Sequence, residues 1–400
     1  MRLRIYLGLF VLVLVAASIS SAATNRRIHP SAHVPQGFVG VNIDGPMILP
    51  SAHVDLAHQF DVMVANGVQS VRLAFSWVAA QPYASWAEVP AGRQARFQKG
   101  AGGVPTDFSV TDQFVELAAQ RGLNVLPTVL YAPGWDAGSN RSGGFAPPKR
   151  TGPYADYLTT LIRRYGPHGS FWSSHRAIRP RAIRMWQIWN EPNLSGYWPQ
   201  PFASSYVGLL RAAHGAIKRA DPGAKVVLGA LTNTAWKYLG QVDRIRGARS
   251  QFDVISVNGF TSTPNNVMLY LQLVRRAANQ LGDRKKPLLA TEFSWPSALH
   301  KSPQHFDWNV TEAGQARNIG ALLPMLAARR SSLRLLGFYY YSWMGDESLG
   351  ASAFEFAGLL RYQSGGRIVA KPALAAYRRA ALALEGCRRK GSLATRCLKR

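Results

Sequence analysis

Short apolar runs alternate with segments of helical spacing along most of the chain. Eight runs predict strands at Phe38–Ile43, Val68–Phe75, Leu123–Leu130, Ile183–Trp189, Lys225–Leu231, Phe252–Asn258, Pro287–Thr291 and Leu333–Tyr341. Apolar residues three and four apart predict helices at Val54–Ala65, Thr111–Arg121, Pro153–Tyr165, Ser204–Ala220, Pro264–Leu281, Thr311–Arg329 and Lys371–Leu384. The strand runs are apolar almost throughout, which is typical of strands buried on both faces.

Eight strands that alternate with helices between residues 37 and 385 predict a single α/β domain, a (β/α)8 barrel. The alternative is a doubly wound open sheet, which usually carries a glycine-rich phosphate loop after its first strand, and we find none. Ala79–Val110 and Tyr131–Gly152 are predicted as long loops after the second and third strands. Both are rich in Gly, Pro and aromatic residues, which suits the walls of a substrate site.

The first residues have the composition of an export signal. Met1–Arg4 is basic, Ile5–Ala17 is almost wholly apolar, and small residues follow up to Ala23. We expect a signal peptide at 1–23, a linker at 24–36 and a secreted protein without stable membrane insertion after cleavage. An uncleaved anchor is the alternative, but the apolar run is shorter than the roughly 18 residues of a spanning helix.

Basic residues outnumber acidic ones by 47 to 21, a net charge of +26. The charge indicates either an arginine-rich solvated surface or an anionic partner such as an acidic polymer of the cell envelope. The bases are scattered, with an excess in the tail 386–400, whereas nucleic-acid-binding modules concentrate them on one stripe. We therefore expect no nucleic-acid partner.

The two cysteines, Cys387 and Cys397, lie in the tail. In an oxidising compartment they are predicted to form a disulfide, and a reduced pair is the alternative. No His lies at zinc spacing from them, and no His-Glu-x-x-His pattern occurs, so we expect neither metal nor cofactor.

Acidic residues at strand ends are the candidates for chemistry, because barrel enzymes work at the carboxyl ends of their strands. The candidates are Asp44, Asp136, Glu191, Glu292, Asp346 and Glu347. Glu191 and Glu292 stand out, since each ends an apolar run and has aromatic neighbours. Burying a carboxylate there is costly without a partner, which favours function over an ion pair with a nearby Arg.

These residues lie in a wider resemblance, from about Gly37 to Leu384. Trp189–Asn193, with Asn-Glu-Pro at its centre, and Thr291–Trp295 resemble the strand-four and strand-seven catalytic segments of the retaining glycoside hydrolases with (β/α)8 barrels. Val71–Leu73 with Trp77, Tyr339–Trp343, Gly358–Leu360 and Lys371–Ala373 resemble further segments of that clan. Within it, the sequence is most similar to family 39-like and family 5-like enzymes.

The resemblance implies a role for each matching residue. Glu191 would be the acid/base and Glu292 the nucleophile, about 5–5.5 Å apart as retention requires. Arg72 would keep Glu292 charged, and Asn190 would bind the sugar hydroxyl beside the anomeric carbon. Trp343 would stack on the sugar ring, and a core Trp near a strand end is the alternative for it. Trp135, Trp198 and Trp295 would line outer subsites, where packing is an equal alternative.

The sixth strand departs from the clan. Asn258 stands where a His is frequent, and Phe260 lacks the Tyr hydroxyl that contacts the nucleophile, so Tyr131 is a candidate to supply one. We expect a secreted retaining glycosidase acting on an oligo- or polysaccharide. Two alternatives stay open: a carbohydrate-binding pseudo-enzyme, and a basic envelope-binding protein that uses the barrel as a scaffold.

Overall fold

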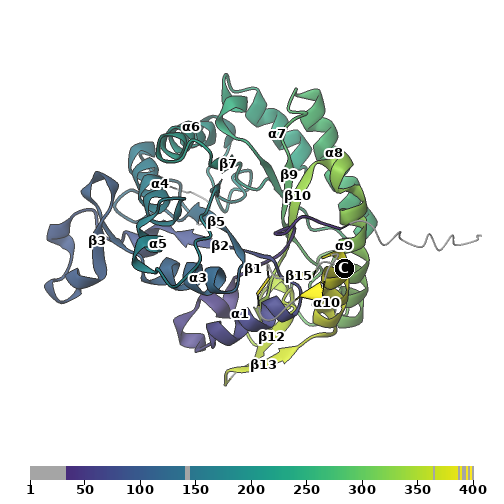
Figure 1. Cartoon of the computed structure of the whole chain (residues 1–400). Coiled ribbons are helices and arrows are strands. Elements are labelled where there is room, and N and C mark those ends of the chain that lie inside the picture. Colours follow the sequence, from purple (N-terminus) through teal and green to yellow (C-terminus); the bar gives the residue numbers. More distant parts are fainter. Residues whose placement is uncertain are drawn as a thin grey trace, which may run out of the picture. The chain divides into compact units, whose positions relative to one another are not determined.

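Eight parallel strands form a ring that the helices surround (Figure 1). They are β1 (Val39–Asn42), β2 (Ser70–Ser76), β5 (Asn124–Leu130), β6 (Met185–Ile188), β7 (Lys225–Val227), β8 (Ile255–Asn258), β9 (Leu288–Phe293) and β10 (Leu335–Tyr340). Their order is β7-β6-β5-β2-β1-β10-β9-β8. Single parallel bridges, Val227 to Val254 and Leu231 to Val257, join the two ends of this sheet. The predicted (β/α)8 barrel is thus confirmed, and the doubly wound alternative is wrong.

This computed structural model describes residues 33–139, 145–363, 365–385, 388–389, 393–394 and 397–398. The predicted signal peptide, most of the linker and Cys387 lie outside the described residues, as does the side chain of Cys397. Two short strands of the tail, β14 (Arg388–Arg389) and β15 (Cys397–Leu398), pair antiparallel. The disulfide and the signal peptide stay predictions.

The helices cover the outside of the ring. They are α1 (Leu56–Ala65), α2 (Trp77–Ala80), α3 (Ser109–Gln120), α4 (Thr151–Tyr165), α5 (Ser170–Ser174), α6 (Ala203–Ala220), α7 (Ala235–Asp243), α8 (Pro264–Gln280), α9 (Glu312–Leu333) and α10 (Pro372–Leu384). Short 3-10 helices are η1 (Gly45–Ile48), η2 (Pro50–Ala52), η3 (Trp86–Glu88), η4 (Ala91–Arg96), η5 (Ala101–Gly103), η6 (Ala248–Gln251) and η7 (Ala353–Phe356). The described part of the chain holds no helix long and apolar enough to cross a membrane.

Two connections contain more structure than the pattern predicted. The segment after β2 forms a hairpin of β3 (Phe97–Lys99) and β4 (Pro105–Asp107), which projects from the ring in Figure 1. The segment after β10 forms a small sheet of β11 (Met344–Asp346), β12 (Leu360–Gln363) and β13 (Arg367–Ala370). These strands are too short for an alternation of apolar and polar residues to be read.

The interior of the ring has an apolar layer and, nearer the carboxyl ends of the strands, a polar layer. Leu126, Val227, Val254, Leu289 and Tyr339 form a buried cluster contributed by β5, β7, β9, β10 and the residue before β8. Nearer the carboxyl ends of the strands, polar side chains replace apolar ones. A barrel is normally filled by side chains at every level, so this polar layer marks the site.

Candidate active site

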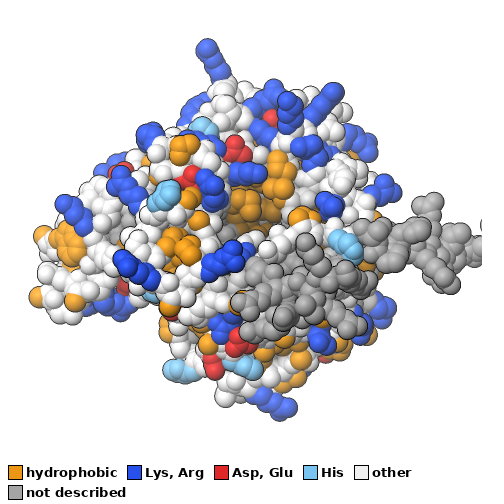
Figure 2. Space-filling view, in the orientation of Figure 1, with side chains coloured by type: hydrophobic (Ala, Val, Ile, Leu, Met, Phe, Trp, Pro, Cys, Tyr) orange, Lys and Arg blue, Asp and Glu red, His pale blue; other side chains and the backbone are white. Residues whose placement is uncertain are grey.

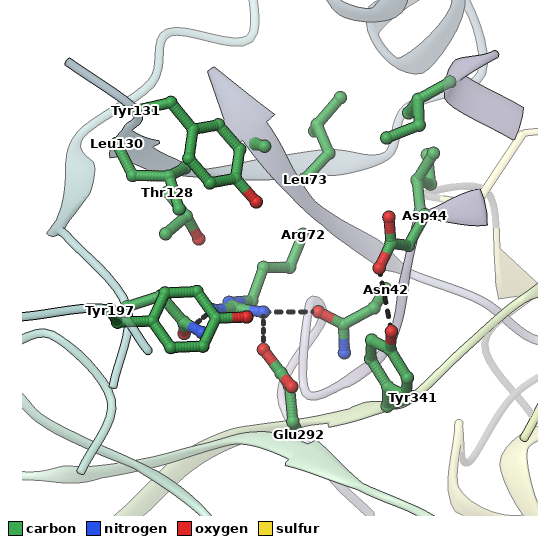
Figure 3. Close-up of a pocket in the computed structure, with 14 residues that line it drawn as sticks. Asn42, Asp44, Arg72, Leu73, Thr128, Leu130, Tyr131, Tyr197, Glu292 and Tyr341 are labelled. Atoms are coloured by element: carbon green, nitrogen blue, oxygen red, sulfur yellow. Dashed lines mark hydrogen bonds and ion pairs between the residues drawn. The ribbon is translucent and has the colours of Figure 1, made fainter. Parts of the chain in front are cut away.

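A small cavity of about 100 Å³ opens where six of the barrel strands end (Figure 3). Its wall is built by residues inside β2 and β5, by residues at or after the carboxyl ends of β1, β5, β6, β9 and β10, and by one residue of η1. They are Asn42, Ile43, Asp44, Ile48, Arg72, Leu73, Ala74, Thr128, Leu130, Tyr131, Asn190, Tyr197, Glu292 and Tyr341. Four residues predicted from the sequence, Arg72, Tyr131, Asn190 and Glu292, therefore meet in one wall.

Arg72 is the centre of the polar layer. Its Nη1 donates to Glu292 Oε1 over 2.6 Å and to Asn42 Oδ1 over 2.7 Å. Its Nε donates to Gln187 Oε1 over 2.8 Å, and its Nη2 donates to Asn190 Oδ1 over 2.8 Å. The side chains of Arg72 and Glu292 are only 6% and 12% exposed. Charge-assisted hydrogen bonds of this kind hold both groups in one orientation.

The two candidate glutamates have different surroundings. Burial raises the pKa of Glu191 to about 8, and the negative charge of Glu292 adds to the rise. Burial also raises the pKa of Glu292 above its ordinary value, but Arg72 opposes this rise both as a charge and as a hydrogen-bond donor. A proton shared by the pair therefore resides on Glu191, because only Glu292 is ion-paired.

Asn258, the residue at the departure in the sixth strand, lies between the two glutamates. Its Nδ2 donates to Glu191 Oε1 over 2.9 Å, and its Oδ1 accepts from Thr291 Oγ1 over 2.8 Å. This amide hydrogen bond lowers the pKa of Glu191, and Asn258 lowers that of Glu292 too. Asn258 thus supplies a donor to the candidate acid.

Glu191 itself does not belong to the wall of the cavity. The residue is 8% exposed, whereas Asn190, the residue before it in the chain, does line the cavity. Its backbone has a φ of 43°, and Trp189 and Tyr131 have φ values of 66° and 67°. Left-handed conformations in non-glycine residues cost of order 1–3 kcal/mol each and gather at functional sites. All three lie at the carboxyl ends of neighbouring strands.

Three tyrosine side chains close the cavity, and the sequence singled out only Tyr131. Burial raises the pKa of Tyr131 to about 12, with Asp44 and Glu292 adding to the rise. Burial also raises the pKa values of Tyr197 and Tyr341. All three hydroxyls therefore stay protonated and can donate hydrogen bonds. Tyr341 donates to Asp44 Oδ2 over 2.8 Å.

Trp343 corrects a sequence prediction. Its side chain is fully buried, and its indole N–H donates to Gln59 Oε1 of α1 over 3.0 Å. It cannot stack on a sugar in this structure because it packs behind the wall. Tyr341, two residues earlier, faces the cavity in its place.

The other tryptophans do not line the cavity either. Trp198 and Trp295 are buried, and the indole N–H of Trp198 donates to Ser205 Oγ over 2.9 Å. For these two, the packing alternative holds. Trp135 is half-buried and its indole N–H donates to Gln81 O over 2.8 Å. Its place in an outer subsite stays a prediction.

The sequence missed Tyr197 and Tyr341 and left Asp44 among six strand-end acids. Asp44 and Tyr341 directly follow apolar strand segments, so strand-end position alone was a usable indicator for both. Tyr197 lies in the connection after β6, where no periodicity marks it. Among the described residues, no group of three or more His, Cys, Asp or Glu side chains is placed to hold a metal ion.

The chain matches known proteins in structure but not in sequence. No family model and no curated sequence matches the chain. A family 39 glycoside hydrolase from the gut symbiont Bacteroides cellulosilyticus WH2 matches with a TM-score of 0.60 at 17% identity, over 89% of this chain and 64% of that one. A monomeric beta-xylosidase from Caulobacter crescentus CB15 matches with a TM-score of 0.57 at 20% identity, over 86% and 68%.

This chain covers nearly the whole length of a third matching structure. The GH53 catalytic domain of Ignisphaera aggregans has a TM-score of 0.57 at 23% identity, over 87% of this chain and 97% of that domain. By contrast, the chain spans less than two thirds of the length of the family 39 enzyme. The fold is accordingly one that glycoside hydrolases of several families share.

Proposed function

We propose that the chain is a retaining glycoside hydrolase, with Glu292 as nucleophile and Glu191 as acid/base. One observation carries the proposal: a carboxylate held by Arg72 in the cavity wall, electrostatically coupled to a second buried carboxyl whose pKa is raised to about 8. Two carboxyl groups with divided protonation are what double displacement requires. The first 23 residues suggest that it acts outside the cell on an oligo- or polysaccharide.

In the first step, Glu292 Oε attacks the anomeric carbon while Glu191 gives its proton to the departing glycosidic oxygen. A glycosyl ester forms on Glu292, and the aglycone leaves as an alcohol. Glu191, now ionised, then removes a proton from water, which attacks the anomeric carbon and regenerates Glu292. Protonated Glu191 at neutral pH and ionised Glu292 are the starting states that this sequence needs.

Asn190 has a positioning role in this scheme. Its Oδ1 accepts from Arg72, which turns its Nδ2 away from the guanidinium. That amide group is then directed at the sugar hydroxyl beside the anomeric carbon, a contact that strengthens in the transition state. Arg72 thereby orients both the nucleophile and the amide that binds next to it.

Two glutamate substitutions separate the roles. With a 2,4-dinitrophenyl glycoside, Glu191→Ala should keep an efficient first step, because this leaving group needs little protonation, and azide should restore turnover. Poor leaving groups should lose about 10²–10⁴-fold. Glu292→Ala should lose hydrolysis of every substrate. Glu116→Ala, on α3 where the Glu116 carboxylate accepts from Gln120 Nε2, is the control and should be unaffected.

A carbohydrate-binding pseudo-enzyme is the second candidate. The absence of Glu191 from the cavity wall favours it, since the acid must reach the glycosidic oxygen. Screening the wild-type protein on α- and β-aryl glycosides distinguishes the two candidates. Binding without turnover would support the pseudo-enzyme. An inverted product at early times by NMR would rule out retention.

A further inference from the structure

One carboxylate in the cavity has no part in the chemistry proposed above. Asp44 follows β1, is half-buried and lines the cavity wall. Figure 3 shows its carboxylate on the side of the cavity opposite Tyr131, with one oxygen bonded to Tyr341. A carboxylate has about four acceptor positions, so one hydrogen bond leaves most of its capacity for a ligand.

Tyr341 is held from behind by aromatic side chains. Phe260 and Phe354 meet its ring edge-on, with centroid distances of 6.2 and 6.0 Å. The Phe at the sixth-strand departure therefore packs against the residue that hydrogen-bonds Asp44. Edge-to-face aromatic pairs have defined geometry, so the packing keeps the Tyr341 hydroxyl directed at Asp44.

The described charges of the cavity wall sum to a negative value in a protein whose net charge is +26. On the face shown in Figure 2, the charged side chains are mostly Lys and Arg, with few Asp and Glu. The described residues of the wall include the carboxylates of Asp44 and Glu292, and Arg72 is the one cationic residue among them. Four of the five guanidinium N–H groups of Arg72 already donate to protein acceptors, namely Gln187, Asn42, Glu292 and Asn190. Among the described residues of the wall, one N–H group of Arg72 is the only cationic donor left for an acidic group of a ligand.

The remaining polar groups suit uncharged hydroxyls. The hydroxyls of Tyr131, Tyr197 and Tyr341 stay protonated, since burial raises their pKa values. A sugar hydroxyl both donates and accepts, so it can donate to Asp44 while accepting from a tyrosine. A sugar carboxylate can only accept, and it would lie beside two like charges.

We propose, as a refinement that rests on the proposed function, that the sugar seated against Glu292 is uncharged and that Asp44 binds its hydroxyls and excludes glycuronides. The carboxylate of Asp44 thus determines specificity from the end of β1. Asp44 would contact the sugar away from the reacting bond, and its charge also adds to the raised pKa of Glu292.

Matched pairs of aryl glycosides test the assignment. Each pair has the same leaving group and anomeric configuration and differs only at C6: glucoside against glucuronide, and galactoside against galacturonide. For the wild-type protein, kcat/KM should favour the neutral member of the accepted pair by about 100-fold or more, as expected for like charges in a low-dielectric site.

Asp44→Asn keeps an oxygen that can accept from Tyr341 but removes the charge. It should lower kcat/KM for the neutral sugar by about 10–100-fold and reduce the preference over the uronide at least tenfold. Asp61→Asn, which removes an acid paired with Arg121 on the outer surface, should change neither value.

The outcomes distinguish two failures. Hydrolysis of the uronide as fast as of its neutral partner would overturn the assignment of Asp44 and leave the glycosidase function standing. The assignment is also overturned if Asp44→Asn slows both members equally, because a merely structural role would act that way. Hydrolysis of no pair by the wild-type protein would overturn the proposed function and this inference with it.

Discussion

Replacing Glu191 by Gln should stabilise the protein in alkaline solution and leave its stability unchanged in acid. The folded state raises the pKa of Glu191 from 4.5 to about 8 because the group is buried beside Glu292. The stability that comes from its bound proton is present below pH 4.5 and is lost as pH rises through 8. One pKa unit corresponds to about 1.4 kcal/mol, so the rise from 4.5 to about 8 means that the free energy of unfolding falls by ~5 kcal/mol once Glu191 is ionised.

Gln has the shape of protonated Glu and can accept from Asn258, so the variant never undergoes this loss. At pH 9 its Tm should exceed that of the wild-type protein by roughly 6 °C, as expected for ~5 kcal/mol in a chain of 400 residues. At pH 5, just above the unfolded-state pKa of 4.5, the two should differ by less than about 1 kcal/mol. Calorimetry or circular dichroism at both pH values measures the difference in Tm. Because the two proteins share every other titratable group, the effects of those groups cancel when the proteins are compared at the same pH.

Glu312→Gln is the matched control. Burial works against ionisation of Glu312, but Lys301 and Arg361 prevail and lower its pKa. Its replacement should therefore destabilise the protein at pH 9 rather than stabilise it. If Glu191→Gln has the wild-type Tm at pH 9, or gains equally at pH 5 and pH 9, the electrostatic account of the glutamate pair is wrong.

Four further predictions concern the glutamate pair and one basic face of the surface. The kcat/KM of the wild-type protein should fall as pH rises through about 8, where Glu191 loses its proton. Arg72→Met should raise the pKa of Glu292 and move the acid limb of the pH–rate profile upward, and an unmoved limb would contradict the pairing. Asn258→Ala removes a donor to Glu191 and should shift the alkaline limb to higher pH, whereas a downward shift would refute its role. On the outer surface, Arg181 has its pKa lowered by burial and by Arg179, and no described carboxylate pairs with either. Changing both to Ser should reduce the salt needed for elution from an acidic-glycan column more than Arg121→Ser does, and equal elution would exclude this face as the anionic site.

The barrel could be predicted because its strands are buried on both faces. Each of the eight apolar runs coincides with a barrel strand, displaced by at most four residues at its ends. The strand-end position also led to Glu191 and Glu292, whereas Arg72, the third residue of β2, was expected only from the family resemblance. The two glutamates are identifiable because a charge that abuts an apolar strand is costly unless other groups meet it.

The rest of the site depends on how side chains turn after the strands end. Tyr341 and Trp343 are two residues apart in the same segment, yet one faces the cavity and the other packs on α1. Period-two alternation does not extend beyond β10, which ends at Tyr340. Tyr197 enters the wall through a connection whose path only the folded chain defines. The position of Tyr197 therefore depends on tertiary contacts, about which the local sequence pattern carries no information.

The most direct test of the central claim is to trap the nucleophile. Wild-type protein is incubated with 2,4-dinitrophenyl 2-deoxy-2-fluoro glycosides of xylose, glucose, galactose, mannose and arabinose in both anomeric forms. The fluorine slows hydrolysis of the glycosyl ester, so intact mass should rise by one fluorosugar. Peptide mapping should place it on Glu292, and Glu292→Ala should take up none. A label on Glu191, or hydrolysis of the parent glycoside with no label at any residue, would contradict the account.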